Sequence, residues 1–193
     1  MKVLYIDTTT ADLVVAVIEQ NKITDVSQRA MGVKHSETLC NKVAEALAEA
    51  GVGFDCFDAY ACAVGPGSFT GIRIGISTIK GYCTAIERPY IEVNSLEAIA
   101  RSAFCGKIGR AVIDAGNGYY YFDGNVTLPY VIPYDDVTAV NAGSASGACD
   151  YLDGAVEIIC QKYADNDFSK TLSPIYIRKS QAEITRENLL KNK

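Results

Sequence analysis

Apolar and polar residues follow one another along this chain with two periods, one typical of strands and one typical of helices. Short apolar runs, continuous or alternating with polar residues, predict strands at residues 3–7, 12–19, 22–26, 59–64 and 90–93. Apolar positions spaced by three and four residues predict helices at residues 36–50, 68–86 and 95–102. The resulting order, β-β-β-α-β-α-β-α, favours an α/β domain.

The regular pattern ends near residue 103. Residues 104–109 contain two glycines and a cysteine and show no periodicity, so we place a domain boundary between 1–103 and a smaller unit, 104–193. The predicted elements of the smaller unit are strands at residues 110–115, 118–123, 130–133 and 138–140 and a helix at 155–164. An extended segment is expected at 174–178. Residues 183–193 favour a helix that either packs on the first domain or stays mobile.

The longest predicted helix, residues 68–86, has a narrow stripe of mostly small residues beside its large apolar stripe and its polar stripe. The members of the narrow stripe are Gly71, Gly75, Thr78, Ala85 and, at its far end, Tyr82. Each glycine inside a helix costs about 1 kcal/mol relative to alanine, so a close approach of another part of the structure must offset the loss. That neighbour is either the protein's own sheet or a helix of another subunit.

Four short segments resemble the landmarks of one known family. They are GPGSFTGIRIG after a predicted strand (residues 65–75), IDTTT (6–10), HSETL at a helix start (35–39) and PIYIR (174–178). Together they resemble the TsaB (YeaZ) family, most closely over residues 1–103. The resemblance implies an actin-like (ASKHA, ribonuclease H-like) α/β fold of two half-domains with a truncated, degenerate second half.

The TsaB family is the non-catalytic partner in bacterial synthesis of threonylcarbamoyladenosine in tRNA. The resemblance implies a cytoplasmic scaffold subunit that pairs, helix to helix, with a TsaD-type catalytic subunit acting on the adenosine beside the anticodon. It also implies a TsaE-type ATPase as a partner, homodimers through the same face, and only indirect contact with tRNA. The residues expected at the partner interface are Leu39, Val43, Leu47, Gly71, Gly75, Thr78 and Tyr82. Under this hypothesis, Gly75→Leu keeps the fold and abolishes pairing.

One turn resembles part of the nucleotide site of actin-like ATPases and sugar kinases, and a second turn has the glycine-rich composition of anion-binding turns. Asp7, Thr8 and Thr9 end the first strand as a first phosphate loop does, and Gly65, Gly67 and Ser68 form a glycine-rich turn before a helix. This turn has neither the ending of a P-loop nor the spacing of a dinucleotide-binding loop. Local hydrogen bonds within the first turn explain Asp7 and the threonines more simply. We expect no tightly bound cofactor; the resemblance allows ATP or ADP at the subunit junction, and these six residues are the candidates to lie near it.

Composition narrows the classes of function. The net charge of −5 argues against unaided binding of nucleic-acid phosphates, and no apolar run is long enough for a membrane span. Because no export signal precedes the first strand, we interpret the seven cysteines as reduced, mostly core thiols of a cytosolic protein. The single histidine, His35, excludes sites that need two, and we expect it to bond nearby backbone.

Two enzymatic alternatives remain. A stand-alone actin-like ATPase or small-molecule kinase would use Asp7, Thr8 and Thr9 for magnesium and phosphate, but the short second half would not close a nucleotide cleft. A peptidase would need His35 together with Ser36 or a distant cysteine, and the chain has no nucleophile-elbow pattern. We therefore predict no catalytic residue and no metal site in this chain by itself.

Overall fold

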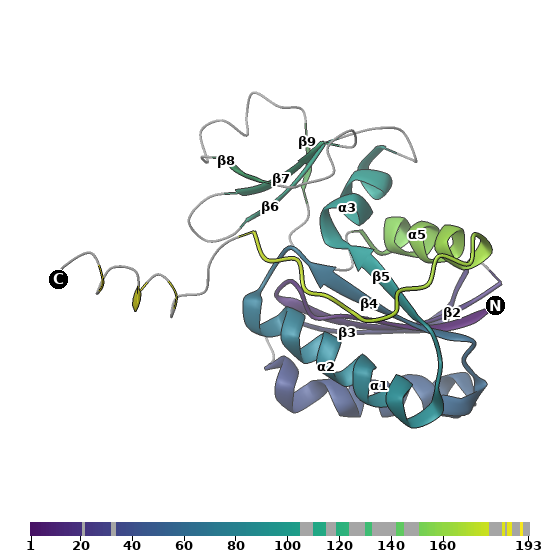
Figure 1. Ribbon diagram of the computed structural model, residues 1–193. Coiled ribbons are helices and arrows are strands. Elements are labelled where there is room, and N and C mark those ends of the chain that lie inside the picture. The colour runs from purple at the N-terminus through teal and green to yellow at the C-terminus, as the bar shows by residue number, and fades with distance from the viewer. Residues whose placement is uncertain are drawn as a thin grey trace.

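The computed structural model describes residues 1–20, 22–31, 34–104, 110–114, 119–123, 130–132, 142–144 and 151–177, with positions 183, 185, 186 and 190 (Figure 1). Its strands are β1 (Lys2–Asp7), β2 (Asp12–Glu19), β3 (Lys22–Met31), β4 (Ala59–Gly65), β5 (Tyr90–Asn94), β6 (Arg110–Asp114), β7 (Tyr119–Asp123), β8 (Tyr130–Ile132) and β9 (Ala142–Ser144). Its helices are α1 (His35–Ala50), the short 3₁₀ helix η1 (Phe54–Cys56), α2 (Phe69–Ile86), α3 (Ser95–Phe104) and α5 (Leu152–Ala164). The element order predicted through residue 103 is confirmed. The strand predicted at 138–140 and most of the helix predicted at 183–193 lie outside the described residues.

The described strands form two sheets, one of five strands in the order β3-β2-β1-β4-β5 and one of four in the order β8-β7-β6-β9. In the larger sheet β1 runs antiparallel to β2, with Val3 opposite Ile18, and parallel to β4, with Val3 beside Ala59. Strand β5 continues the parallel part. The carboxyl ends of β1, β4 and β5 therefore meet at one end of the sheet, where the turns into α2 and α3 begin.

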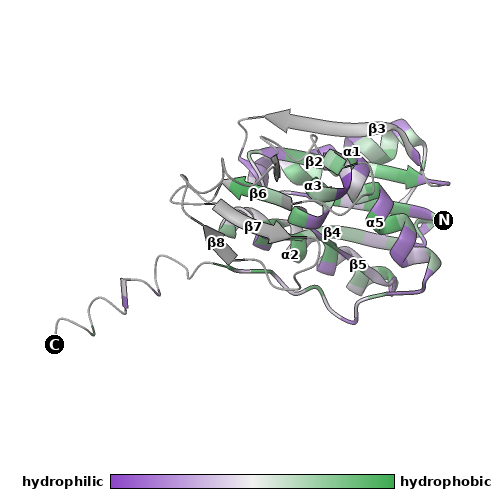
Figure 2. Ribbon diagram, turned by 90° about the horizontal axis from the view of Figure 1, so that it is seen from above, coloured by the Kyte–Doolittle hydropathy of each residue, from purple (hydrophilic) through white to green (hydrophobic). Residues whose placement is uncertain are grey.

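Helices cover both faces of the larger sheet (Figure 1). Because side chains alternate along a strand, Leu4 and Ile6 of β1 pack with α1 and α2, whereas Val3 and Tyr5 pack with α3 and α5. Strands β2 and β4 run through this hydrophobic interior (green in Figure 2). Burial on two faces explains why these strands are nearly continuous apolar runs in the sequence.

Helix α5 follows the predicted domain boundary in sequence, yet it packs on the larger sheet beside α3 and β5 (Figure 1). The contact with α3 is close at Gly154, where a Cβ would overlap the carbonyl oxygen of Ala98. The N–H of Gly154 donates to Ser102 Oγ at 2.8 Å. Arg101 of α3 reaches Glu157 of α5 at 3.2 Å. The contact with α3 thus places α5 on the first sheet, although α5 comes after the predicted boundary. The domain boundary at residue 103 stays a prediction.

A segment after α5, residues 168–177, runs along the outer edge of β5 and is called the strap here (Figure 1). The N–H of Ser169 donates to the carbonyl oxygen of Tyr90 at 2.9 Å, and the N–H of Ile175 donates to that of Val64 at 2.8 Å. The first bond satisfies a backbone group of the edge strand β5 that would otherwise be open to another chain, and the second joins the strap to the inner strand β4.

The two glycines of the small-residue stripe of α2 face the protein's own sheet, whereas Ala85 of the same stripe is exposed. A Cβ on Gly71 would overlap the carbonyl oxygen of Thr8, and one on Gly75 would lie 2.6 Å from Thr8 Oγ1 and 3.3 Å from Cys62 Sγ. Both glycines are buried. Of the two neighbours that the pattern allowed, the sheet is the one observed, so neither glycine is available to a partner. This contact also reverses the expectation for Gly75→Leu, because a leucine there would force α2 away from β1.

Candidate functional site

Strand β1 ends in a buried carboxylate whose two oxygens are fully hydrogen-bonded. Asp7 is 0% exposed. Its Oδ1 accepts the backbone N–H and the hydroxyl of Thr9, both at 2.7 Å. Its Oδ2 accepts the hydroxyls of Tyr5 and Tyr151, both at 2.9 Å. Four donors therefore surround Asp7, which is the arrangement that makes burial of a carboxylate tolerable.

The side chains around Asp7 come from distant parts of the chain, and we call Tyr5, Asp7, Thr9, Ser95 and Tyr151 the Asp7 cluster. Thr9 lies in the β1–β2 turn, Ser95 begins α3, and Tyr151 directly precedes α5. Thr9 Oγ1 lies 3.2 Å from Ser95 Oγ and 3.1 Å from the hydroxyl oxygen of Tyr151. The polar contacts of the Asp7 cluster hold the first residue of α3 and the residue before α5 at the carboxyl end of β1.

Sequence reasoning found Asp7 and Thr9 as site candidates but missed Tyr5, Ser95 and Tyr151. A tyrosine in a buried strand needs a partner for its hydroxyl. Tyr5 stands two residues before Asp7, on the same face of β1, so that signal was present. Tyr151 is 144 residues from Asp7, and no local pattern connects the two.

The glycine-rich turn between β4 and α2 lies against the β1–β2 turn. The N–H of Ser68 donates to the carbonyl oxygen of Thr9 at 2.7 Å, and a Cβ on Gly67 would overlap the same oxygen. Gly65 has a φ of +101°, which only glycine adopts without strain. Ser68 Oγ caps α2 by accepting the N–H of Gly71 at 3.2 Å. The residues expected near a nucleotide, Thr8 included, therefore lie together at one junction.

The junction does not fit a nucleotide phosphate or its metal ion at Asp7. Both oxygens of Asp7 are taken, the hydroxyl of Thr9 donates to Asp7, and the hydroxyl of Thr8 donates to the carbonyl oxygen of Gly71 at 2.6 Å. Among the residues that the structure describes, no three His, Cys, Asp or Glu side chains form a group that could hold a metal ion. Local hydrogen bonds of the turn thus account for Asp7, Thr8 and Thr9.

The first turns of α2 present a fixed arginine at the surface. The guanidinium carbon of Arg73 lies 4.0 Å from the ring centroid of Phe69 and 5.6 Å from that of Tyr176 in the strap. The two rings stack with centroids 4.6 Å apart. Arg73 Nε also donates to the hydroxyl of Tyr176 at 2.8 Å. An exposed cation is thereby held between its own helix and the strap.

Comparison with known proteins identifies the family. The family model described as "TsaD: tRNA N6-adenosine threonylcarbamoyltransferase" matches residues 19–128, which is more than half of the chain. The chain belongs to this family. Its individual relatives narrow the match to the TsaB (YeaZ) type within it, which confirms the resemblance found in the sequence.

Two curated relatives carry the name "tRNA threonylcarbamoyladenosine biosynthesis protein TsaB". The Haemophilus influenzae protein is 33% identical over 104 residues, covering 54% of this chain and 44% of its own length. The Escherichia coli protein is 32% identical over 126 residues, covering 63% and 54%. The chain therefore spans about half the length of these relatives.

A solved structure confirms the fold. YeaZ from Pseudomonas aeruginosa has a TM-score of 0.75 and 23% sequence identity, and the match covers 91% of this chain and 100% of that chain. With the mixed sheet and the helices on both of its faces, this likeness confirms the predicted actin-like (ASKHA, ribonuclease H-like) α/β fold.

Most residues expected at the TsaB-type partner interface are inside the protein. Leu39, Val43 and Leu47 are buried where α1 packs on the sheet, so they are corrected to core residues, like the two stripe glycines of α2. Thr78 and Tyr82 are half-buried. The ring of Tyr82 packs against that of Phe54 in a tilted arrangement, with ring centroids 4.6 Å apart. Periodicity had marked the inward faces of α1 and α2, whereas a partner would contact their outward faces.

The buried tyrosines predict a loss of stability at alkaline pH. Burial, and then the charge of Asp7, raises the pKa values of Tyr5 and Tyr151 well above the usual 10.0; burial raises the pKa of Tyr82 to about 12. Above a pH of about 10 the unfolded chain releases these protons first. We therefore expect the free energy of unfolding, measured in urea, to fall as the pH rises beyond 10.

The variant Tyr151→Phe tests the origin of that pH dependence. It removes one group with a raised pKa, so its free energy of unfolding should fall less steeply above a pH of about 10 than that of the unchanged protein. Equal slopes for both proteins would show that Tyr151 does not contribute to the alkaline loss.

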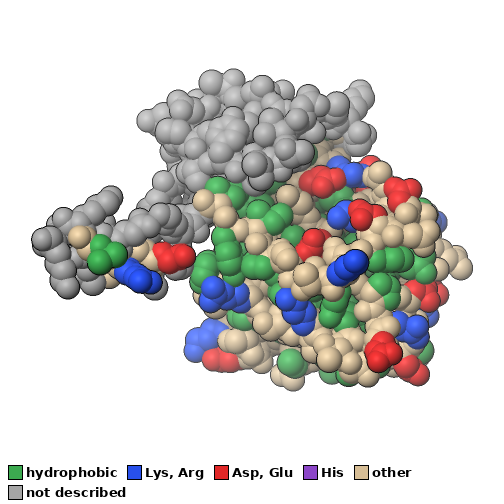
Figure 3. Space-filling model, in the orientation of Figure 1, with side chains coloured by type: hydrophobic (Ala, Val, Ile, Leu, Met, Phe, Trp, Pro, Cys, Tyr) green, Lys and Arg blue, Asp and Glu red, His purple; other side chains and the backbone are tan. Residues whose placement is uncertain are grey.

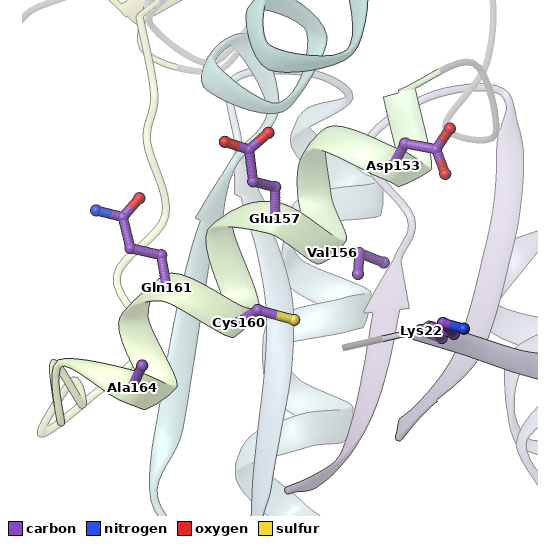
Figure 4. Close-up of a pocket in the computed structure, with 7 residues that line it drawn as sticks. All are labelled: Lys22, Asp153, Val156, Glu157, Cys160, Gln161 and Ala164. Carbon is purple, nitrogen blue, oxygen red and sulfur yellow. The ribbon is translucent and has the colours of Figure 1, made fainter. Parts of the chain in front are cut away.

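A groove of about 730 Å³ lies apart from these residues, between α5 and the start of β3 (Figure 4). Its lining residues are Lys22, Asp153, Val156, Glu157, Cys160, Gln161 and Ala164. In Figure 4 Cys160 points toward Lys22, whereas Glu157 and Gln161 point the other way. Burial raises the pKa of the Cys160 thiol, which keeps it protonated and weakly nucleophilic. None of the expected site residues lines this groove.

Three smaller expectations can be compared with the described residues. His35 Nε2 lies 3.3 Å from the carbonyl oxygen of Ala11, so it contacts backbone as expected, although that backbone is 24 residues away in sequence. The described cysteines are free, but Cys40 and Cys56 are exposed, so the expectation of mostly core thiols is only partly met. In the described part of the chain, no helix is long and apolar enough to cross a membrane.

Proposed function

We propose that this chain is a non-catalytic scaffold or activator subunit in the formation of threonylcarbamoyladenosine in tRNA. Its partner would be a TsaD-type catalytic subunit that modifies the adenosine beside the anticodon. The names of the family model and of the TsaB relatives support the pathway. Contact with tRNA would then be indirect, through the catalytic subunit, in keeping with a net charge of −5.

The burial and the hydrogen bonding of Asp7 support the non-catalytic role. In the kinase-like alternative, this carboxylate at the end of β1 would have to face a metal ion and phosphates. Here it is 0% exposed and accepts hydrogen bonds from Tyr5, Thr9 and Tyr151. A carboxylate enclosed in this way supports a structural role for Asp7 and speaks against the kinase-like alternative.

The outward faces of α1 and α2 are the proposed pairing surface. The two helices lie on the same face of the larger sheet (Figure 1). The exposed or half-exposed polar residues of α2 include Thr70, Arg73, Ser77, Thr78, Lys80 and Thr84. Homodimers through the same surface would compete with the TsaD-type partner. A TsaE-type ATPase as a further partner, and ATP or ADP at the subunit junction, stay predictions of the resemblance.

Reconstitution with the TsaD-type subunit from the same cell tests this proposal. We expect a one-to-one complex in size-exclusion chromatography with and without ATP. We also expect modified adenosine in tRNA, measured by mass spectrometry, to form only when both subunits and the other pathway proteins are present. The chain alone should not hydrolyse ATP. Absence of a complex together with ATP hydrolysis by the chain alone would instead support the kinase-like enzyme.

The same experiment tests the competition between the two dimers. Adding the TsaD-type subunit should convert homodimers of this chain into heterodimers, because both associations use one surface. A complex that contains a homodimer through α1 and α2 together with the catalytic subunit on that surface would contradict the proposed pairing.

A further inference from the structure

Helix α2 carries positive charge that the described structure does not neutralise. Arg73 and Lys80 are its only charged residues. Within the described part of the chain, neither forms an ion pair with a carboxylate. At the neighbouring α1, by contrast, Lys34, which directly precedes the helix, pairs with Glu37 at 3.0 Å, and Lys42 pairs with Glu45. The outward face of α2 is therefore basic in a chain whose net charge is −5.

The two cations share one side of α2. Seven residues are about two turns of helix, so Arg73 and Lys80 lie on the same stripe, about 10 Å apart along the axis. Ser77, which is exposed, lies between them. Figure 3 shows Lys and Arg side chains, with Asp and Glu side chains among them, on the face that carries α2 and the strap.

The position of the Arg73 guanidinium also favours the binding of a ligand. Its guanidinium rests on Phe69 and near Tyr176, and its Nε donates to the hydroxyl of Tyr176. No described residue accepts a hydrogen bond from its two terminal nitrogens. A planar guanidinium that is already fixed loses little entropy when it binds a bidentate oxygen ligand such as a carboxylate.

From these observations we propose that Arg73 anchors an acidic segment of a protein partner, with Lys80 as a second contact. The inference rests on the proposed function, because it assigns the acidic segment to the TsaD-type subunit. A carboxylate of Asp or Glu on that subunit binds the terminal nitrogens of Arg73. The exposed aromatic surface beside Arg73, including Tyr176 at 38% exposure, packs against the same segment.

A protein partner fits this surface better than a nucleic acid does. Binding of RNA phosphates needs clustered cations and is opposed by a negative protein. The surface formed by α2 and the strap has two separated cations and one aromatic pair, Phe69 with Tyr176. Arginine beside aromatic rings is instead a common anchor of protein interfaces.

Calorimetric titration with the purified TsaD-type subunit tests the proposal on the full chain. Arg73→Met keeps a long apolar stem over the rings but removes the charge, and Arg73→Lys keeps the charge but removes the planar fork. We expect Kd to rise about tenfold or more for Arg73→Met and less for Arg73→Lys. The matched control is Lys162→Met on α5, on the opposite face of the sheet, which should leave Kd unchanged. The dependence of Kd on salt should also be weaker for Arg73→Met.

The possible results separate this inference from the proposed function. If Arg73→Met binds as tightly as the unchanged chain while its thermal unfolding is unchanged, the anchor is wrong and the pairing itself still stands. If the unchanged chain does not bind the TsaD-type subunit at all, both proposals fail. If the chain alone binds tRNA and Arg73→Met abolishes that binding, the ligand is a phosphate and the proposed partner is wrong.

Discussion

Replacing Gly71 with alanine should lower the free energy of unfolding by about 3 kcal/mol or more, or prevent folding. The new methyl group would overlap the carbonyl oxygen of Thr8, which belongs to backbone and cannot rotate away. Relief would require α2 to move from the β1–β2 turn. That movement would break the 2.6 Å hydrogen bond from Thr8 Oγ1 to the carbonyl oxygen of Gly71. Urea unfolding followed by circular dichroism measures the loss.

A second glycine on the same helix is the control. Gly81 is exposed, and a Cβ built there has no atom within 4 Å. Gly81→Ala should therefore stabilise the protein by up to about 1 kcal/mol, the difference in helix propensity between the two residues. The opposite signs of the two variants test the packing of α2. Equal stability of Gly71→Ala and the unchanged protein would contradict the close contact between α2 and the β1–β2 turn.

The glycines of α2 show which structural features a sequence pattern predicts and which it does not. The periodicity identified the stripe of Gly71 and Gly75 and the need for a close neighbour, and both are observed. It did not identify the neighbour, because a turn of the protein's own sheet and a helix of another subunit demand the same small residues. The register of α2 against β1 depends on strand pairing that a helical wheel does not contain.

Local sequence patterns are limited in the same way when they are used to predict the Asp7 cluster. Asp7 at the end of an apolar run is a local pattern, and the turn that holds its Oδ1 is formed by Thr9, two residues away. Whether Asp7 could bind a ligand depends on which groups contact its Oδ2. That place is taken by Tyr5 and by Tyr151, and the second comes from a part of the chain without any motif. A carboxylate that looks like a phosphate-loop residue in sequence is therefore enclosed by hydrogen-bond donors in the fold.

Asp7→Ala should lower the free energy of unfolding by about 3 kcal/mol. The replacement removes the acceptor of four hydrogen bonds in a site that solvent does not reach. The hydroxyls of Tyr5 and Tyr151 then lose a shared partner while they stay buried, and unsatisfied buried donors are costly. Urea unfolding measures the change. Should the alanine variant fail to fold, Asp7→Asn, which keeps the size and one acceptor oxygen, should show a smaller loss.

A double-mutant cycle with Tyr151→Phe assigns the loss to the Asp7 cluster. Tyr151→Phe alone removes one of the four donors, so we expect a loss of about 1 kcal/mol. In the double variant Asp7→Ala with Tyr151→Phe, the hydroxyl that lacked an acceptor is gone, so its total loss should be smaller than the sum of the single losses. Strict additivity would mean that Asp7 and Tyr151 do not act together. If Asp7→Asn instead kept full stability but abolished an ATP hydrolysis by the chain alone, Asp7 would be a catalytic residue and the scaffold role would be wrong.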